Sequence, residues 1–319
     1  MPAKAKAASA SYIEPARRSR SKRLRMRNNW DYLIFIIPVI LYFLIFCYGP
    51  MYGVQLAFKR FNPALGITAS PWIGADNFER LFGSFQFTRI LKNTLVINLL
   101  KTCISFPIPI ILALMFNEIR RERLKKTFQT ITYAPYFIST VVFVGIINLF
   151  LAGENGYINN ILEMLGIAPI PFLTSPSYFS GVYVGSDVWR NSGWNSIIFI
   201  AALSGVDPQL HESAQIDGAS RFKRIIHVNL PCIMPTIVIQ FILQMGKMMT
   251  LSYERILLMQ NSLNIEASEV ISTYAYKTGL INMDYGFSTA VGLFNNVINI
   301  VLLLAANKIA KRYSSSSLF

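Results

Sequence analysis

Charged residues are scarce in this sequence. Only 14% of its 319 residues are charged, while 53% are hydrophobic, and soluble domains usually contain about 25% charged residues. There are three cysteines and two histidines, at no spacing typical of a disulfide framework or a zinc site. The ATP-binding pattern G-x-x-x-x-G-K-[ST] and the H-E-x-x-H pattern of metalloproteases do not occur. We therefore predict no catalytic residue, no metal site and no cofactor bound by this chain.

The sequence does contain long apolar segments. A helix needs roughly 20 mostly apolar residues to cross the hydrocarbon of a bilayer. Six segments fit, at 31–52, 93–116, 130–151, 179–203, 233–258 and 286–306. The fourth carries Asp187, Arg190, Asn191 and Asn195 in its first half, so it should face protein or a water-filled path rather than lipid. The sequence predicts an all-α integral membrane protein with six transmembrane helices.

The basic residues predict the orientation, because cytoplasmic connections are rich in Lys and Arg. Nine precede the first segment, five lie between the second and third, three between the fourth and fifth, and three after the sixth. The connection after the third segment has none and the one after the fifth has only Lys277, whereas the first has four between residues 59 and 89 and fits least well. Both termini are thus expected in the cytoplasm, with the chain crossing the membrane several times.

This distribution also accounts for the formal net charge of +14 without nucleic acid as a partner. Residues 1–29 are expected to form a disordered basic tail on anionic lipid. Residues 30–313 are expected to form the transmembrane domain, and 314–319 a flexible tail.

A polar stretch, ESAQIDGASRFKRIIHVNLP, interrupts the apolar pattern at 212–231. Asp207 and Pro208 are typical of a helix start, and Gly218 of a helix end, so we expect short helices at 209–217 and 220–228. Pro231 should change the chain direction into the next segment. The pattern alone leaves two interpretations open, an amphipathic helix on the lipid headgroups or a helix that inserts into a groove of a cytoplasmic partner.

The spacing in this stretch resembles the EAA coupling loop of ABC importer permeases. Glu212, Ser213 and Ala214 match Glu-Ala-Ala, and Gly218 follows after three residues. After nine further residues the sequence reads Val-Asn-Leu-Pro, so that only the middle Ser and the Val depart from the family pattern. The resemblance extends to other segments, such as WDYLIFIIPVILYFLIFCYGPMYGVQLAFKRFNP. They are similar to the maltose-permease-like family of carbohydrate-uptake permeases, and especially to its LplB-type oligosaccharide branch.

This resemblance implies the type I permease fold of ABC importers in the plasma membrane of a bacterium, with a coupling loop at 207–231. It also implies a second homologous permease as partner, two ATPase subunits that bind ATP and Mg, and an extracytoplasmic binding protein that delivers an oligosaccharide. In such permeases the first loop helix lies in a cleft of the ATPase. The residues expected to couple this chain to the ATPase are Glu212, Ser213, Ala214, Asp217, Gly218, Phe222, Ile226, Leu230 and Pro231.

Polar side chains within the segments indicate a substrate path, because such groups are costly in a membrane unless they have a function. Amides can bond sugar hydroxyls, and aromatic rings can pack on sugar C–H faces. Gln240, Gln244 and Lys247 share one helix face and are the preferred group. Packing between helices is the competing interpretation for each residue. The predicted path comprises Asn98, Lys101, Trp189, Arg190, Asn191, Trp194, Gln240, Gln244, Lys247, Asn295 and Asn299.

Two cations of this path suggest the charge of the cargo. Arg190 can pair with Asp187 one turn earlier, and Arg255 lies beside Glu254, but Lys101 and Lys247 have no acidic neighbour in the sequence. Unpaired cations facing a cavity would suit an acidic, uronate-containing oligosaccharide.

The alternative to an ABC importer permease is an ion-coupled secondary transporter. For such a transporter, inverted repeats and broken helices would be expected in both halves.

Overall fold

A computed structural model describes residues 30–153 and 155–313, and the predicted tails 1–29 and 314–319 lie outside this range. Every regular element in the described residues is a helix, apart from one isolated bridge between Lys59 and Trp72. The chain divides into two units, Met1–Gln55 and Leu56–Phe319. The predicted all-α class is confirmed.

The first unit is a run of apolar helix. It begins with α2 (Trp30–Tyr42) and continues through η1 (Phe43–Tyr48) and α3 (Gly49–Met51) toward η2 (Tyr52–Phe58). Every side chain from residue 34 to residue 52 is exposed, and nearly all are apolar. A helix that is apolar on all sides requires lipid or another apolar surface around it.

Four helical segments of the described residues are long and apolar enough to cross a membrane. They are Ile34–Phe58, Phe87–Glu118, Arg221–Met245 and Tyr285–Arg312, and a bent pair, Glu122–Phe137 with Thr140–Leu151, makes a fifth if it is one span. Helix α11 (Pro176–Ser204) has 29 residues, which is about 43 Å, but it is not among these apolar segments. The count of six spans and the orientation therefore remain predictions.

The expectation of a single helix at 130–151 is wrong. The chain forms α8 (Glu122–Tyr133), η3 (Ala134–Phe137) and α9 (Thr140–Leu151), and the two halves meet at 103°. Pro135 has no N–H to continue the helix. The Ser139 side chain accepts a hydrogen bond from the Val142 N–H and so begins a new helix.

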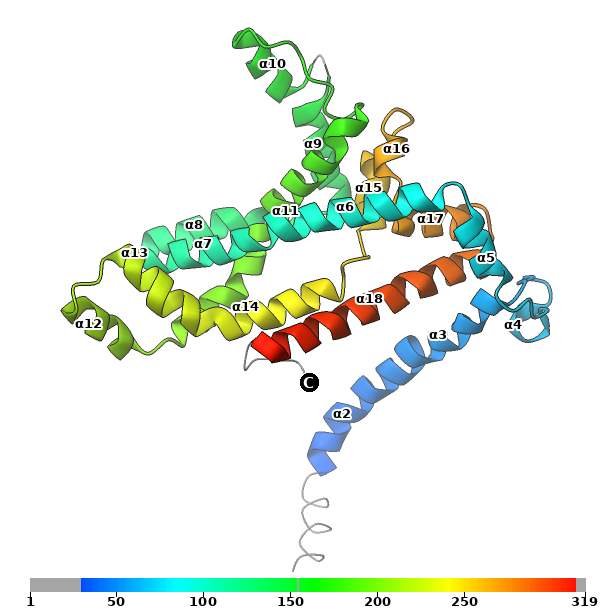
Figure 1. Ribbon diagram of the computed structural model, residues 1–319, viewed down its shortest axis with the longest axis horizontal. Helices are drawn as coiled ribbons and strands as arrows, with labels where there is room; N and C mark the ends of the chain where they lie inside the picture. Colours follow the sequence, from blue (N-terminus) through cyan, green and yellow to red (C-terminus); the bar gives the residue numbers. More distant parts are fainter. Residues whose placement is uncertain (1–29, 154, 314–319) are drawn as a thin grey trace, which may run out of the picture. The chain divides into compact units, whose positions relative to one another are not determined.

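The expected bounds of the fifth segment and the expected turn at Pro231 are also wrong. One helix runs through α13 (Arg221–Arg224), η4 (Ile225–Asn229) and α14 (Leu230–Met245), as Figure 1 shows. The Leu230 N–H bonds to the Ile225 carbonyl five residues earlier. This wider π turn accommodates a proline within a helix because it changes the local hydrogen-bond pattern. The helix ends at Met245, and a separate helix, α15 (Tyr253–Met259), follows after a short connection.

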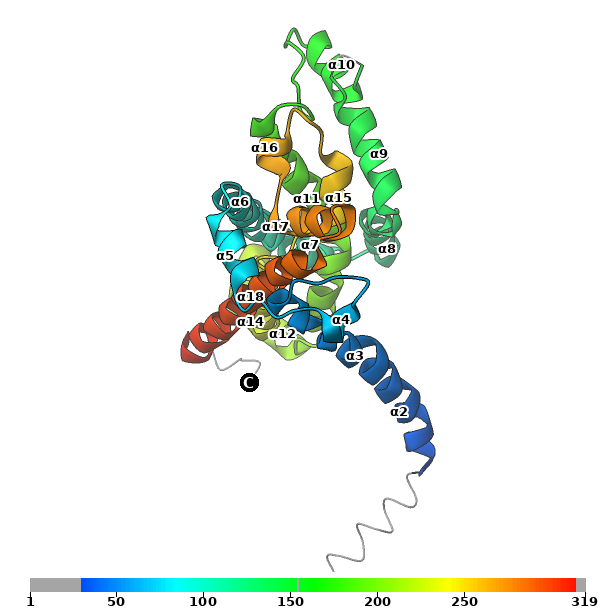
Figure 2. The ribbon, with the colours of Figure 1, turned by 90° about the vertical axis from the view of Figure 1, so that its right-hand side faces the viewer.

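Helix α11 organises the second unit. It packs against α6 (Phe87–Ser105), α7 (Pro107–Glu118), α8 and α14, an arrangement visible in Figure 1 and Figure 2. Its first half joins an apolar cluster with Phe143 and Ile256, and its second half joins another with Ala113 and Ile233. The remaining elements are α4 (Gly66–Ala69), α5 (Asp76–Gly83), α10 (Tyr157–Met164), α12 (Pro208–Ile216), α16 (Ile265–Ser268), α17 (Ile271–Tyr276), η5 (Lys277–Ile281) and α18 (Tyr285–Tyr313).

Helices α11 and α8 cross in close contact at Gly193. A Cβ atom at this position would overlap the backbone carbonyl of Thr132 in the last turn of α8. Only glycine permits this approach, because a backbone carbonyl cannot move aside as a flexible side chain can.

We expect Gly193→Ala to destabilise the protein by about 1–3 kcal/mol, the usual range for overpacking. Gly185→Ala is the matched control on the same helix, since a Cβ there meets no atom within 4 Å, and alanine favours helix by roughly 0.5–1 kcal/mol. Thermal unfolding of both variants in detergent checks this. Equal melting temperatures would contradict the close crossing.

Candidate substrate cavity and coupling loop

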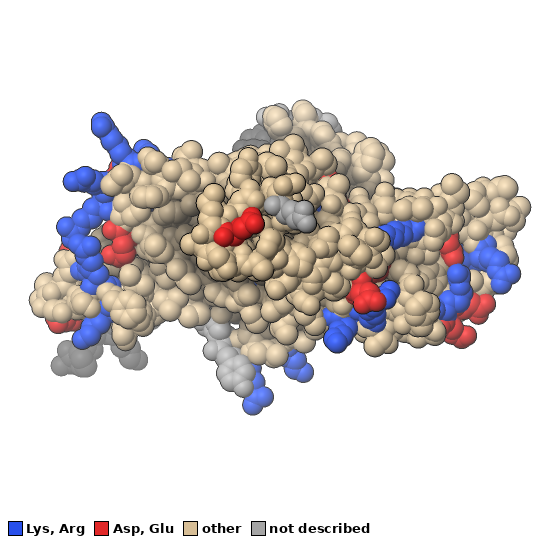
Figure 3. Space-filling model, turned by 90° about the horizontal axis from the view of Figure 1, so that it is seen from above, with Lys and Arg blue, Asp and Glu red and all other residues tan. Residues whose placement is uncertain are grey.

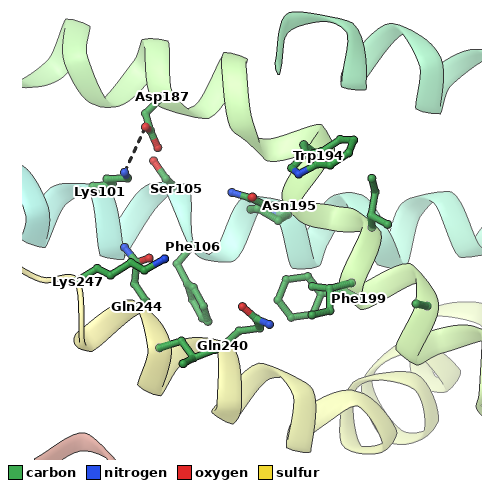
Figure 4. Close-up of a pocket in the computed structure, with 15 residues that line it drawn as sticks. Lys101, Ser105, Phe106, Asp187, Trp194, Asn195, Phe199, Gln240, Gln244 and Lys247 are labelled. Carbon is green, nitrogen blue, oxygen red and sulfur yellow. Dashed lines mark ion pairs between the residues drawn. The ribbon is translucent and has the colours of Figure 1, made fainter. Parts of the chain in front are cut away.

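A cavity of about 640 Å³ lies among α6, α7, α11 and α14. Figure 4 shows amide, hydroxyl and charged groups pointing into it from several helices, with aromatic rings between them. Its polar lining residues are Lys101, Ser105, Asp187, Asn195, Gln240, Gln244 and Lys247, and its aromatic ones are Phe106, Trp194 and Phe199.

Five residues of the predicted substrate path meet at this cavity. Gln240 and Gln244 line it from α14 and Lys247 from just beyond the helix end, as their shared helix face predicts. Lys101 lines it from α6 and Trp194 from α11. The other six predicted residues do not line the cavity.

Three of those six make contacts with protein groups outside the cavity. Asn98 is buried and donates to the Thr94 carbonyl, while Asn299 joins the Met249 N–H to the Thr250 hydroxyl. Trp189 lies against Phe143. Their contacts fit the packing interpretation.

The other three also lie away from the lining. Arg190 donates to the Ile138 carbonyl and to the Thr140 hydroxyl, and Asn191 donates to the carboxylate of Asp187. The Asn295 Oδ1 atom is buried without a hydrogen-bond partner among the described residues.

Asp187 forms the ionic contacts of the cavity wall. Its Oδ1 atom lies 3.3 Å from the Lys101 Nζ atom and 3.0 Å from the Arg255 Nη2 atom. The expectations that Lys101 lacks an anionic partner and that Asp187 pairs with Arg190 are therefore wrong. The two cations come from α6 and α15, whereas Asp187 lies on α11, so their pairing has no signal in local sequence spacing.

The cavity keeps an excess of positive charge. Lys247 makes no ion pair in the part of the chain that the structure describes. Asp187 is the single carboxylate in the lining, and the buried Arg255 already neutralises it. Lys101, Lys247 and Arg255 thus face a single carboxylate, so positive charges exceed negative ones at this cavity.

Uncharged groups in the lining are arranged for contact with a polar ligand that has apolar faces. The Trp194 ring is stacked on Tyr136, with centroids 4.6 Å apart and planes within 3°. This contact fixes the orientation of the Trp194 ring before a ligand binds. The Ser105 hydroxyl is buried and has no hydrogen-bond partner among the described residues. Sequence reasoning missed Ser105 because a single serine in an apolar helix has no distinguishing pattern.

The coupling-loop residues form a compact turn built from local hydrogen bonds. The Asp207 side chain accepts from the Gln209 N–H at 2.9 Å and begins α12. Gly218 has a φ of +73°, and the Ala219 N–H bonds to the Ala214 carbonyl at 2.9 Å. This is the Schellman geometry of a helix end that favours glycine. The predicted helix start and stop are confirmed.

The surface of this loop is apolar at several points and basic around them. No residue of α12 is buried, and Ile216 and Phe222 are 87% and 70% exposed. Ile226 is 38% exposed. Figure 3 shows Lys and Arg gathered at the end of the view that holds α12 and α13. Figure 1 shows the start of α8, which follows the basic connection at 120–126, at the same end of this unit as α13.

Residues 105–315 match the family described as "Binding-protein-dependent transport system inner membrane component". The chain belongs to this family. It is therefore a membrane-embedded permease subunit rather than an enzyme, and the resemblance seen in the coupling loop is confirmed. The alternative of an ion-coupled secondary transporter is not retained.

Relatives of this permease include two proteins of Bacillus subtilis (strain 168). It is 42% identical to "Protein LplB" over 92% of both chains. It is 38% identical to "Polygalacturonan/rhamnogalacturonan transport system permease protein YteP" over 99% of this chain and 98% of the relative.

Two solved structures share the fold. One is described as a bacterial alginate ABC transporter in complex with alginate pentasaccharide-bound periplasmic protein. It matches with a TM-score of 0.84 and 38% identity, over 92% of this chain and 98% of that chain. The other is a bacterial ABC transporter involved in the import of the acidic polysaccharide alginate. Its TM-score is 0.83 at 40% identity, over 92% of this chain and 99% of that chain.

Proposed function

We propose that this permease belongs to an ABC importer that moves acidic, uronate-containing oligosaccharides into the cytoplasm. The observation that carries the proposal is the excess of positive charge in the cavity, where Lys247 has no acidic partner among the described residues. A carboxylate entering such a site gains charge-assisted hydrogen bonds, which are stronger than neutral ones. The glutamines and the Trp194 ring suit the hydroxyls and C–H faces of the sugar rings.

The comparisons support an acidic cargo. The name of YteP refers to polygalacturonan and rhamnogalacturonan, and the solved relative is an importer of alginate, an acidic polysaccharide. The identities of 38% and 40% extend over nearly the whole of this chain. Lysines in the cavity provide a physical reason for the same class of cargo here.

The proposed transporter contains this chain, a second homologous permease, two ATPase subunits and an extracytoplasmic binding protein. The sequence has no ATP-binding motif, so the free energy of ATP hydrolysis has to arrive through contact with another subunit. The exposed apolar groups of Ile216 and Phe222 on short capped helices fit the helix-in-groove mode of recognition. We assign this contact to the ATPase.

Lys247→Gln should slow uptake of an oligogalacturonate about tenfold, since the variant loses one charge-assisted hydrogen bond. Uptake of the same oligomer with its carboxyls methyl-esterified should not change. The measurement is transport of labelled oligomer by the assembled transporter in proteoliposomes. Lys308→Gln, on an exposed position of α18 outside the cavity, is the control. Equal transport of acid and ester by the unmodified protein would overturn the acidic cargo.

Gly218→Val should reduce the coupling between ATP hydrolysis and transport while leaving membrane insertion intact. A left-handed residue other than glycine costs about 1–2 kcal/mol, and the cost here comes from the backbone, because the space around Gly218 is open. The ratio of ATP hydrolysed to sugar transported measures the effect. Gly205→Ala, where φ is −88°, should leave the ratio unchanged. If Gly218→Val transports with the normal ratio, the coupling role is wrong.

Phe222→Ala should weaken co-purification of the ATPase without changing the thermal stability of this chain, because the side chain is 70% exposed. A buried aromatic anchor at an interface typically contributes about 2 kcal/mol or more, so the yield of ATPase should fall clearly. Met164→Ala on α10, 86% exposed, is the control for a general loss of apolar surface. Loss of ATPase from both variants alike would argue against a specific contact.

A further inference from the structure

One carboxylate oxygen in the cavity wall holds three donors. The Oδ1 atom of Asp187 receives the Asn191 Nδ2 donor at 3.0 Å and the Arg255 Nη2 donor at 3.0 Å, and the Lys101 Nζ atom lies 3.3 Å away. Figure 4 shows Lys101 and Asp187 joined across one side of the cavity, with Lys247 and Gln244 also on that side of the view. The cavity therefore contains an internal carboxylate beside the lysines proposed to bind a substrate carboxylate.

The two cations on Asp187 are held very differently. The Arg255 side chain is 3% exposed, and its guanidinium lies 3.8 Å from the centre of the Tyr183 ring, so it is fixed by burial and by a cation–π contact. The Lys101 side chain is 27% exposed, and its distance is the longest of the three. A lysine ammonium on its flexible stem can reorient more easily than a stacked guanidinium.

We infer that Lys101 exchanges its partner, leaving Asp187 for a carboxylate of the incoming oligosaccharide and returning when the sugar leaves. This inference rests on the proposed acidic cargo. Asp187 stays neutralised by Arg255 and hydrogen-bonded to Asn191 during the exchange, so no buried charge is left without a partner. The exchange replaces one ion pair by another of the same chemical kind.

The exchange makes Asp187 an internal competitor of the acidic cargo for Lys101. A neutral sugar offers no carboxylate, so Lys101 stays on Asp187 and contributes nothing to binding. An acidic sugar has to compete with Asp187, which keeps binding weak enough for release. Lys101 thus favours an acidic cargo over a neutral one, and the internal carboxylate limits the affinity for that cargo.

The test is equilibrium dialysis of a labelled oligogalacturonate, and of its methyl ester, against the purified transporter with its partner subunits. Asp187→Asn retains an oxygen for Arg255 and Asn191 but removes the competing charge, so it should bind the acid about five to ten times more tightly. Lys101→Met should bind the acid about ten times more weakly. Neither variant should change binding of the ester more than about twofold, and Asp284→Asn, which removes the acid of the Arg80 ion pair, should change neither ligand.

The double variant decides the mechanism. In the Lys101→Met background, Asp187→Asn should have no further effect, because the competition acts through Lys101. Equal tightening in both backgrounds, or no tightening in a variant that assembles normally, would overturn the exchange. If Asp187→Asn fails to assemble, Lys101→Met must still weaken binding of the acid without weakening binding of the ester. An unchanged affinity of Lys101→Met for the acid overturns the inference.

The same data separate the two proposals. If the unmodified transporter binds acid and ester equally, the acidic cargo itself is wrong. If it prefers the acid and Lys247→Gln reduces that preference, while the Lys101 and Asp187 variants leave it unchanged, the cargo stands and only the exchange fails.

Discussion

The buried carboxylate of Asp187 sets the conditions for the structure around it. A charge removed from water is destabilising by several kcal/mol unless other groups compensate it, and here donors from α6, α11 and α15 meet on one oxygen. The need to compensate this charge fixes the relative positions of three helices that are far apart in the sequence. The apolar cluster that contains Tyr183, Phe143 and Ile256 adjoins this ionic contact through the Arg255 guanidinium, which lies over the Tyr183 ring. One wall of the cavity is thus rigid and has a defined charge.

The cavity and the coupling loop are connected through helices. Helix α11 lines the cavity with Asp187, Trp194 and Asn195 and ends at Ser204, and α12 begins only four residues later at Pro208. On the other side of the loop, the helix that starts at Arg221 reaches the cavity with Gln240 and Gln244. The loop therefore joins two helices of the cavity wall, and a force on α12 acts on both.

Local interactions in this chain could be predicted from the sequence, whereas contacts between distant helices could not. The Asp207 cap and the Gly218 end depend on hydrogen bonds over two to five residues, and the shared face of Gln240 and Gln244 needs only helix geometry. The partners of Asp187 depend on how α6 and α15 pack, which no spacing encodes. The bend near Pro135 and the continuous helix through Pro231 both involve a proline, which removes one donor, and the surrounding packing decides whether the helix breaks or adapts.

The adaptation at Pro231 matters for the transmission of force. A break at this proline would separate the coupling loop from α14 by a flexible joint, and movement of α12 would be absorbed there. The π turn at Ile225–Asn229 instead keeps the helix continuous from Arg221 to Met245, and Asn229 is fully buried within it. Since a continuous helix transmits displacement along its axis, the motif that reads as a terminator in the sequence serves as a stiff connection in the folded permease. The continuous helix also explains why the exposed part of the loop can be short. Under the proposed function, the loop has only to engage the ATPase and turn sharply, while the helices behind it would carry the motion to the cavity.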